Sequence, residues 1–101
     1  MTLRYQTQDD ILRVWLEGEL GHHEAICLMG RLSALVEDHL PAQMELDLSG
    51  LEFMDSSGIA VVVQTARRCR DCGSVLQVVN TPAQARKVFT CAGIHRLVDI
   101  R

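Results

Sequence analysis

Aromatic side chains are scarce in this chain of 101 residues: only 4% of the residues are Phe, Trp or Tyr, although 48% are hydrophobic. A core must therefore be built from Leu, Val, Ile, Ala and Met. The hydrophobic share favours a folded chain over a disordered one. Because the length allows one compact core and no more, we expect a single domain over residues 1–101.

The chain also lacks a basic surface and a long apolar run. Its net charge is −3, and no basic stripe is evident, which argues against nucleic acid as the main partner. No apolar run approaches the roughly 18 residues that span a membrane. The N-terminal residues Met1–Tyr5 contain no apolar signal-peptide core. We expect a cytoplasmic protein without a membrane partner.

Cofactor and enzyme signatures are missing as well. The four cysteines are Cys27, Cys69, Cys72 and Cys91, and without an export signal we expect free thiols. Cys69 and Cys72 form a C-x-x-C that ends a helix, whereas a redox pair begins one, where the helix dipole lowers the thiol pKa. No second paired motif completes a zinc site. With no Walker loop, Ser–His–Asp set or paired catalytic carboxylates, we expect no metal, no cofactor and no enzyme activity.

Hydrophobic periodicity predicts the order β-β-α-β-α-β-α-β. The expected strands are about 2–8, 11–17, 44–48, 75–79 and 97–100, and the expected helices are about 22–39, 57–71 and 82–92. Three successive valines leave a strand as the alternative within the second helix. We expect Thr81 and Gln84 to form a capping box at the third helix, with Pro82 in its first turn. The fold class is α/β: a mostly parallel sheet with an antiparallel N-terminal edge strand and helices packed on it.

The most informative segment is Met54-Asp55-Ser56-Ser57-Gly58, where a strand ends and a helix begins. Unpaired N–H groups and the positive end of the helix dipole meet at such a point. The turn therefore suits a phosphate, either bound from solution or attached to a serine hydroxyl. The alternative is plain N-capping by Asp and Ser. Sites in such sheets lie at the C-terminal strand ends, where the Gly18–His23 turn is also expected.

Three segments together resemble one known family. They are Leu46 to Ile59 with its Asp-Ser-Ser-Gly, Gly18-Glu19-Leu20 before the first helix, and Pro82 to Ile94 with its Gly-hydrophobic ending. They resemble the STAS domains, and within these the anti-sigma factor antagonists of bacteria. The resemblance covers nearly the whole chain, so the expected fold is a single STAS-like domain.

The resemblance implies a regulatory role. Antagonists of this family bind an anti-sigma factor that is also an ATP-dependent serine kinase, and the bound anti-sigma factor then releases its sigma factor. The kinase phosphorylates the second serine of the motif, which weakens binding, and a metal-dependent serine phosphatase reverses the step. In this sequence the acceptor would be Ser57, with Asp55 as the neighbouring acid and Ser56 as the small residue of the turn.

The predicted partner surface combines this turn with residues of the two adjoining helices. It comprises Asp55, Ser56, Ser57, Gly58, His22, His23, Val61, Gln64 and Arg68. The family usually has an acid where this chain has Gly21, a departure that bears on kinase docking. An alternative function is a STAS subunit of a lipid or solute transport complex without a phosphorylation switch. Members of that group commonly lack the second serine, so Ser57 favours the antagonist.

Overall fold

The computed structural model describes all 101 residues as one five-stranded sheet with helices. The elements are β1 (Thr2–Gln8), β2 (Ile11–Leu20), α1 (His22–His39), β3 (Gln43–Met54), α2 (Ser57–Asp71), β4 (Val75–Val79), α3 (Ala83–Cys91), the 3-10 helix η1 (Ile94–Arg96) and β5 (Asp99–Ile100). The strands lie in the order β1-β2-β3-β4-β5. β1 is antiparallel to β2, and every other pair is parallel. The predicted fold class and element order are therefore confirmed.

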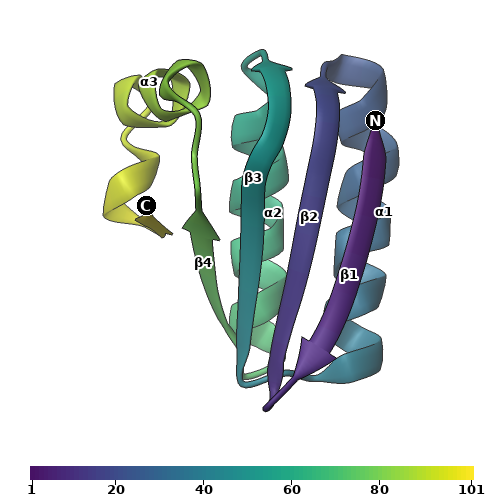
Figure 1. Cartoon of the computed structure of the whole chain (residues 1–101). Coiled ribbons are helices and arrows are strands. Elements are labelled where there is room, and N and C mark those ends of the chain that lie inside the picture. Colours follow the sequence, from purple (N-terminus) through teal and green to yellow (C-terminus); the bar gives the residue numbers. More distant parts are fainter.

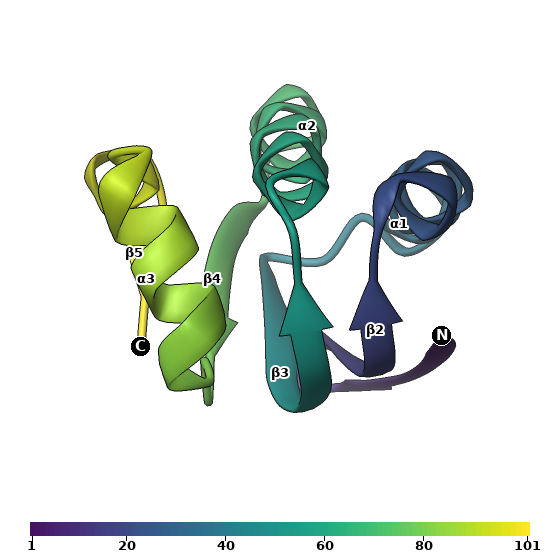
Figure 2. The same ribbon diagram turned by 90° about the horizontal axis from the view of Figure 1, so that it is seen from above.

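The helices α1 and α2 lie side by side on one face of the sheet, and α3 lies apart from them near the end of β4 (Figures 1 and 2). The apolar stripe of α1 explains its placement, because Ala25, Leu28, Leu32 and Val36 recur at helical spacing and are all buried. Twenty-two buried residues form one core between the sheet and its helices, to which α3 contributes Ala85 and Phe89. No helix has the length and the apolar character that crossing a membrane requires.

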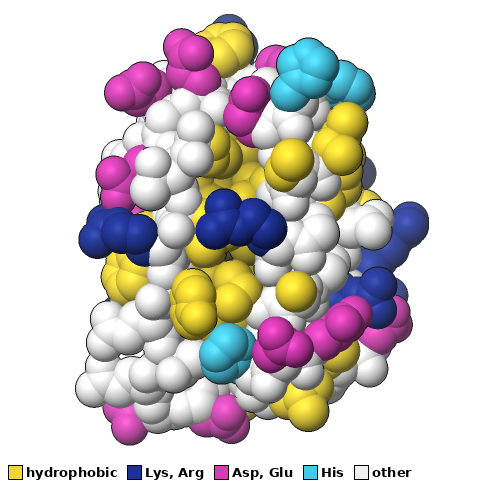
Figure 3. All heavy atoms as spheres, turned by 90° about the vertical axis from the view of Figure 1, so that its right-hand side faces the viewer, with side chains coloured by type: hydrophobic (Ala, Val, Ile, Leu, Met, Phe, Trp, Pro, Cys, Tyr) yellow, Lys and Arg dark blue, Asp and Glu magenta, His cyan; other side chains and the backbone are white.

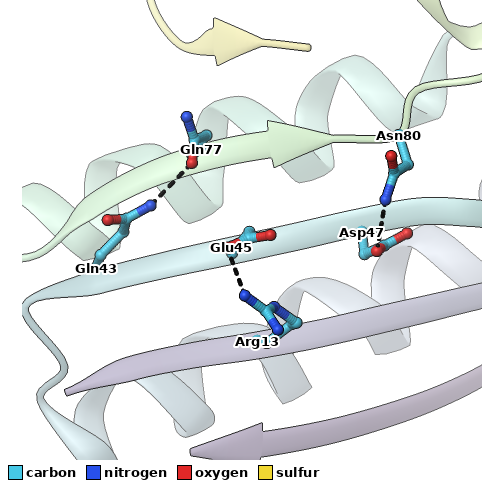
Figure 4. Close-up of polar contacts among 6 residues, drawn as sticks. All are labelled: Arg13, Gln43, Glu45, Asp47, Gln77 and Asn80. Carbon is cyan, nitrogen blue, oxygen red and sulfur yellow. Dashed lines mark hydrogen bonds and ion pairs between the residues drawn. The ribbon is translucent and has the colours of Figure 1, made fainter. Parts of the chain in front are cut away.

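The opposite, open face of the sheet carries no helix (Figure 2) and is polar (Figure 4). Hydrogen bonds and ion pairs link neighbouring strands across it: Arg13 to Glu45, Gln43 to Gln77, Gln77 to Asp99, and Asn80 to Asp47. This pattern follows from the alternation of side chains along a strand, which puts Arg13 of β2 and Gln43, Glu45 and Asp47 of β3 on the face away from the helices. The open face is therefore a solvated surface whose polar groups largely satisfy one another.

The side of the molecule formed by β1 and α1 is different, because hydrophobic side chains are exposed there (Figure 3). Tyr5 of β1 is 52% exposed and makes an edge-to-face contact with His39 of α1, with ring centroids 5.6 Å apart. Six of the seven residues of β1 are exposed. Nothing covers this edge of the sheet.

Three strand ranges and one capping motif were predicted wrongly. The second strand was expected over 11–17 but β2 extends to Leu20, and the last strand was expected over 97–100 but β5 is only Asp99–Ile100. The third strand was expected over 44–48, but β3 runs on to Met54, because its second half pairs with Glu17–Leu20 of β2 across two irregularities of register. The expected capping box at α3 does not form. Pro82 is the N-cap without a side-chain hydrogen bond, and the Gln84 side chain instead bonds the backbone of Met54.

Candidate functional site

The Asp-Ser-Ser-Gly turn lies at the C-terminal ends of β2 and β3. Leu20 and Met54, the last residues of these strands, are paired in the sheet. The backbone N–H of Asp55 donates to the carbonyl oxygen of Leu20 at 3.2 Å. The turn after β3 is thereby joined to the turn that leads into α1, and the sheet brings together two segments more than thirty residues apart in the sequence.

Asp55 holds the first turn of α2. Its Oδ1 accepts a hydrogen bond from the N–H of Ser57 at 2.8 Å, and its carbonyl oxygen accepts one from the N–H of Gly58 at 3.1 Å. The N–H of Ile59 donates to the carbonyl oxygen of Ser56. Three N–H groups at this helix start are thus already satisfied within the protein. The turn has little left to offer a phosphate bound from solution.

The two serine hydroxyls take no part in capping. Ser56 is the N-cap residue but makes no side-chain cap hydrogen bond, and the Ser57 hydroxyl has no hydrogen-bond partner in the protein. Ser56 is exposed and Ser57 is partly exposed. Plain capping therefore explains Asp55 and leaves both serines unexplained. Chemically, the arrangement presents an accessible hydroxyl on a rigid helix start.

Gly58 is required for close packing. A Cβ atom added there would lie 2.2 Å from Sδ and 2.5 Å from Cγ of Met54, and 3.0 Å from Cδ2 of Leu20. Gly58 itself does not have a positive φ angle. The motif glycine thus lets α2, which begins at Ser57, approach the ends of β2 and β3.

At Gly21, where the resembled family usually has an acid, a carboxylate is supplied by a residue of α1. Glu24 reaches back from the first turn of α1, and its Oε1 accepts the N–H of Gly21 at 2.9 Å. A Cβ atom at Gly21 would lie 2.9 Å from that same oxygen and 3.7 Å from Oδ2 of Asp55. Glu24 therefore brings a carboxylate beside Asp55, where the sequence pattern shows only a glycine. The sequence signal that could have identified Glu24 is its position three residues after Gly21, which is typical of a capping box.

A second residue missed by sequence reasoning is Gln84 of α3. Its Oε1 accepts the N–H of Met54 at 2.9 Å, and its Nε2 donates to the carbonyl oxygen of Met54 at 2.7 Å. The side chain thus continues the hydrogen bonding of the sheet beyond the end of β4. It connects α3 to the strand that carries the motif, although thirty residues separate the two in sequence.

The predicted partner residues of α1 and α2 are spread more widely. His22 and His23 are exposed at the start of α1, with ring centroids 6.0 Å apart, and Gln64 is exposed on α2. Val61 is 1% exposed, so it belongs to the core and offers a partner no surface. Arg68 lies near the far end of α2 and pairs with Glu37 of α1 at 3.2 Å. Arg68 therefore links α1 and α2 at a point distant from the turn.

The surface around the turn combines acidic and apolar groups. Phe53, just before the motif, is 49% exposed, and Glu19 and Glu52 are exposed near it at the ends of β2 and β3. On the other side an open hollow lies between α2 and α3. It is lined by Ile59, Gln84, Lys87, Val88, Cys91 and Ala92. Exposed apolar groups beside a polar turn are typical of a protein-binding surface.

Comparison with known proteins points to one family. The family model described as "Mlab, STAS domain" matches residues 3–99. The anti-sigma F factor antagonist of Lysinibacillus sphaericus is 32% identical over 79 residues, which is 78% of this chain and 68% of that protein.

Two solved structures have the same fold. The anti-sigma factor antagonist SpoIIAA in its unphosphorylated form superposes with a TM-score of 0.83 at 22% identity, covering 99% of this chain and 88% of that one. The Bacillus cell fate determinant SpoIIAA in the phosphorylated form gives a TM-score of 0.74 at 22% identity, covering 99% of this chain and 91% of that one.

Proposed function

Since this chain belongs to the STAS domain family, we propose that it is an anti-sigma factor antagonist whose binding is switched by phosphorylation of Ser57. In this role it binds an anti-sigma factor that is also a serine kinase, and the sigma factor is released. It acts through binding and not through catalysis. A metal-dependent serine phosphatase restores the unphosphorylated form.

The observation that supports this proposal most directly is the state of the Ser57 hydroxyl. It stands at the first residue of α2, partly exposed and without a partner in the protein, while Asp55 supplies the cap. A kinase can reach this hydroxyl without disturbing any hydrogen bond that holds the turn. The fold neighbour SpoIIAA has been solved in both unphosphorylated and phosphorylated forms.

The electrostatics of the turn give the switch a physical basis. A phosphoserine adds about −1.5 to −2 charges at pH 7. At Ser57 this charge would lie near the Asp55 carboxylate, and Glu24 lies close to Asp55 in turn. The free protein tolerates it, because water screens the charges and the helix dipole favours an anion there. A docked partner removes that water, and a penalty of about 3 kcal/mol would lower affinity by roughly two powers of ten.

The surface around Ser57 suggests how the partner is held before phosphorylation. The exposed Phe53 and the hollow lined by Ile59 and Val88 offer apolar contacts on either side of the turn. Gln84 and Gly58 hold these elements in place. We expect the contact surface to include His22, His23, Asp55, Ser56 and Ser57, but not Val61 or Arg68.

The test uses the kinase-type anti-sigma factor encoded nearest to this chain in its genome. Calorimetric titration should show binding in the presence of adenine nucleotide, and incubation with ATP should then release the partner. Phosphopeptide mapping should place the label on Ser57. Ser56→Ala is the matched control and should still be labelled, whereas Ser57→Ala should bind without being labelled.

Two outcomes would contradict the proposal. Label that persists in Ser57→Ala would exclude Ser57 as the acceptor. Failure to bind any kinase-type anti-sigma factor, together with co-purification with a transporter permease, would favour the transport-subunit alternative. The fold by itself does not separate these two roles, and it is the free hydroxyl at Ser57 that favours the antagonist.

A further inference from the structure

The outer edge of β1 lacks the features that normally keep sheet edges apart. Natural proteins protect edges with very short strands, charged side chains, prolines or bulges. β1 is seven residues long, contains no proline, and pairs with β2 in continuous register from Thr2 to Gln8. Its Tyr5 is 52% exposed, and hydrophobic side chains gather on this side of the molecule (Figure 3).

The opposite edge of the same sheet shows the contrast. β5 is only two residues long, Asp99–Ile100, and Asp99 forms an ion pair with Arg101 at 3.1 Å. The β5 edge is therefore protected by its short length and its charged residues, whereas the β1 edge is long and regular. The difference within one sheet indicates that the β1 edge is a surface for pairing with another strand.

The single charged residue of β1 does not protect the edge. Arg4 points to the open face of the sheet, where its guanidinium pairs with Glu17 at 2.7 Å and lies over the ring of Trp15 at 5.7 Å. Both partners belong to β2, so the charge is directed back over its own sheet. A strand approaching the edge would meet backbone groups and Tyr5.

A second copy of the same strand fits this edge. Two antiparallel copies of β1, related by a two-fold axis perpendicular to the sheet, pair all seven residues only when the axis passes at Tyr5. Tyr5 then faces Tyr5, Leu3 faces Thr7, and Arg4 faces Gln6. No like charges oppose each other in this register, whereas a shift that centres the axis on Arg4 would place two arginines opposite each other.

We propose that this chain forms a symmetric homodimer in which two β1 strands pair antiparallel and join the two sheets into one of ten strands. Both helical layers then lie on the same face. The strand ends that carry Ser57 point in opposite directions, because the paired strands are antiparallel. Each copy therefore keeps its Asp-Ser-Ser-Gly turn free, and dimerisation is independent of the function proposed for that turn.

The first experiment measures the oligomeric state of the purified chain by sedimentation equilibrium. The wild-type protein should sediment as a monomer–dimer equilibrium. Tyr5→Lys places two ammonium groups opposite each other and should weaken the dimer by about fivefold or more. Val75→Lys, at a 66% exposed residue of β4, adds the same charge away from the edge and should leave the dimer unchanged. A wild-type protein that is monomeric at its highest soluble concentration overturns the proposal.

The second experiment tests the register and does not depend on the stability of the lysine variant. In a background with the exposed Cys27 and Cys91 replaced by serine, Tyr5→Cys should form an intermolecular disulfide under mild oxidation. Directly opposed residues have Cβ atoms about 4.5–5.5 Å apart, so a small movement of the two strands brings them to the roughly 3.5–4.5 Å that a disulfide needs. Thr7→Cys points to the same face but opposes Leu3, so it should not cross-link. Equal cross-linking of the two variants, or none in Tyr5→Cys, overturns the proposed pairing.

Discussion

At the scale of single residues, Ser57 and Gly58 of the motif have separate roles. The Ser57 hydroxyl is left free, whereas the missing side chain of Gly58 is what the packing needs. Glycine is often associated with turns because it adopts positive φ angles, yet Gly58 is needed because Met54 and Leu20 occupy the space where a Cβ would lie. The motif thus positions Ser57 through a close contact between helix and strands.

We expect Gly58→Ala to lower the free energy of unfolding by about 1–3 kcal/mol, because the added methyl group must displace the buried Met54 side chain. Gly30→Ala is the matched control. No atom lies within 4 Å of its added Cβ, and alanine raises helix propensity, so this change should stabilise α1 by up to about 1 kcal/mol. Urea denaturation of both variants checks the signs. A Gly58→Ala protein as stable as wild type would contradict the packing argument.

Cys69 illustrates how position determines thiol chemistry. Burial, with a smaller contribution from Cys72, raises the pKa of the Cys69 thiol to about 11, and its Sγ contacts Sδ of Met44. We expect iodoacetamide at pH 8 to alkylate the exposed Cys27 and Cys91 quickly and Cys69 only after unfolding. Mass spectrometry of timed samples checks the order. Modification of Cys69 as fast as Cys27 in the folded protein would contradict a structural thiol.

At the scale of elements, one side chain of α3 makes the hydrogen bonds that link this helix to the strand before the Asp-Ser-Ser-Gly turn. Gln84 satisfies both backbone groups of Met54, beyond the point where β4 ends. A side chain that bonds both the N–H and the C=O of a residue acts as a short piece of strand. The end of β3 is thereby held on both sides, by β2 and by α3.

Replacing Gln84 by leucine should loosen this end of the sheet. The change removes two hydrogen bonds worth about 0.5–1.5 kcal/mol each. Hydrogen exchange should therefore accelerate at Met54 and in the first turn of α2, while the centre of the sheet stays protected. Gln64→Leu is the control, since Gln64 is exposed on α2 and makes no such bonds. Unchanged exchange at Met54 in Gln84→Leu would show that α3 is held by its apolar face alone.

Asp47 of β3 accepts a hydrogen bond from the side chain of Asn80, the residue after β4, and the strength of this contact depends on pH. Burial raises the pKa of Asp47, but hydrogen bonds from Ser49 and Asn80 and the charge of Arg13 outweigh it and hold the pKa below its usual value. Because the folded-state pKa is lowered, the carboxylate contributes stability above its unfolded pKa of about 3.9. This contribution is lost as the pH falls through the folded-state value.

We expect Asp47→Asn to cost about 1–2 kcal/mol at pH 7, where the charged acceptor is lost. The difference from wild type should begin to shrink near pH 4, where the unfolded chain binds the proton, and should vanish only below the lower folded-state pKa, where the native carboxylate is protonated as well. Thermal melts at several pH values measure this convergence. A difference that stays constant down to pH 2 would assign the loss to geometry and not to charge.

At the scale of the whole molecule, the proposed switch requires a domain that keeps its fold while the charge of its surface changes. One core of 22 residues holds the sheet and helices, and the turn stands at its rim. A charge added at Ser57 therefore alters the surface without entering the core. Binding and folding can then be separated by experiment.

Ser57→Asp should leave the melting temperature close to that of the wild type while weakening partner binding. The helix dipole favours the new carboxylate by about 0.3–1 kcal/mol, and repulsion from nearby Asp55 opposes it. Circular dichroism measures the fold, and calorimetric titration with the anti-sigma factor measures affinity. Ser57→Ala is the uncharged control and should keep both. If Ser57→Asp binds as tightly as wild type, the charge mechanism is wrong for this protein.

Much of the architecture could be predicted from the sequence because its elements carry strong local signals. The ranges of α1, α2 and β4 agree with the expected 22–39, 57–71 and 75–79. Each is bounded by a clear marker, such as Pro41 after α1 or Gly73, with φ +76°, after α2. The second half of β3 carried no such signal, since Ser49, Gly50 and Glu52 interrupt the apolar pattern. Its partner strand, and not its composition, makes it extended.

The sequence by itself determined the class of fold, the turn that carries Ser57 and the family, because these depend on local periodicity and on contiguous motifs. Tertiary structure alone decided which side chains surround that turn. Glu24, Gln84 and Leu20 reach it from other elements, and Val61 is removed from the surface because α2 packs it into the core. The reason is that side-chain hydrogen bonds and burial depend on distances between segments that are remote in the sequence, and only packing sets those distances.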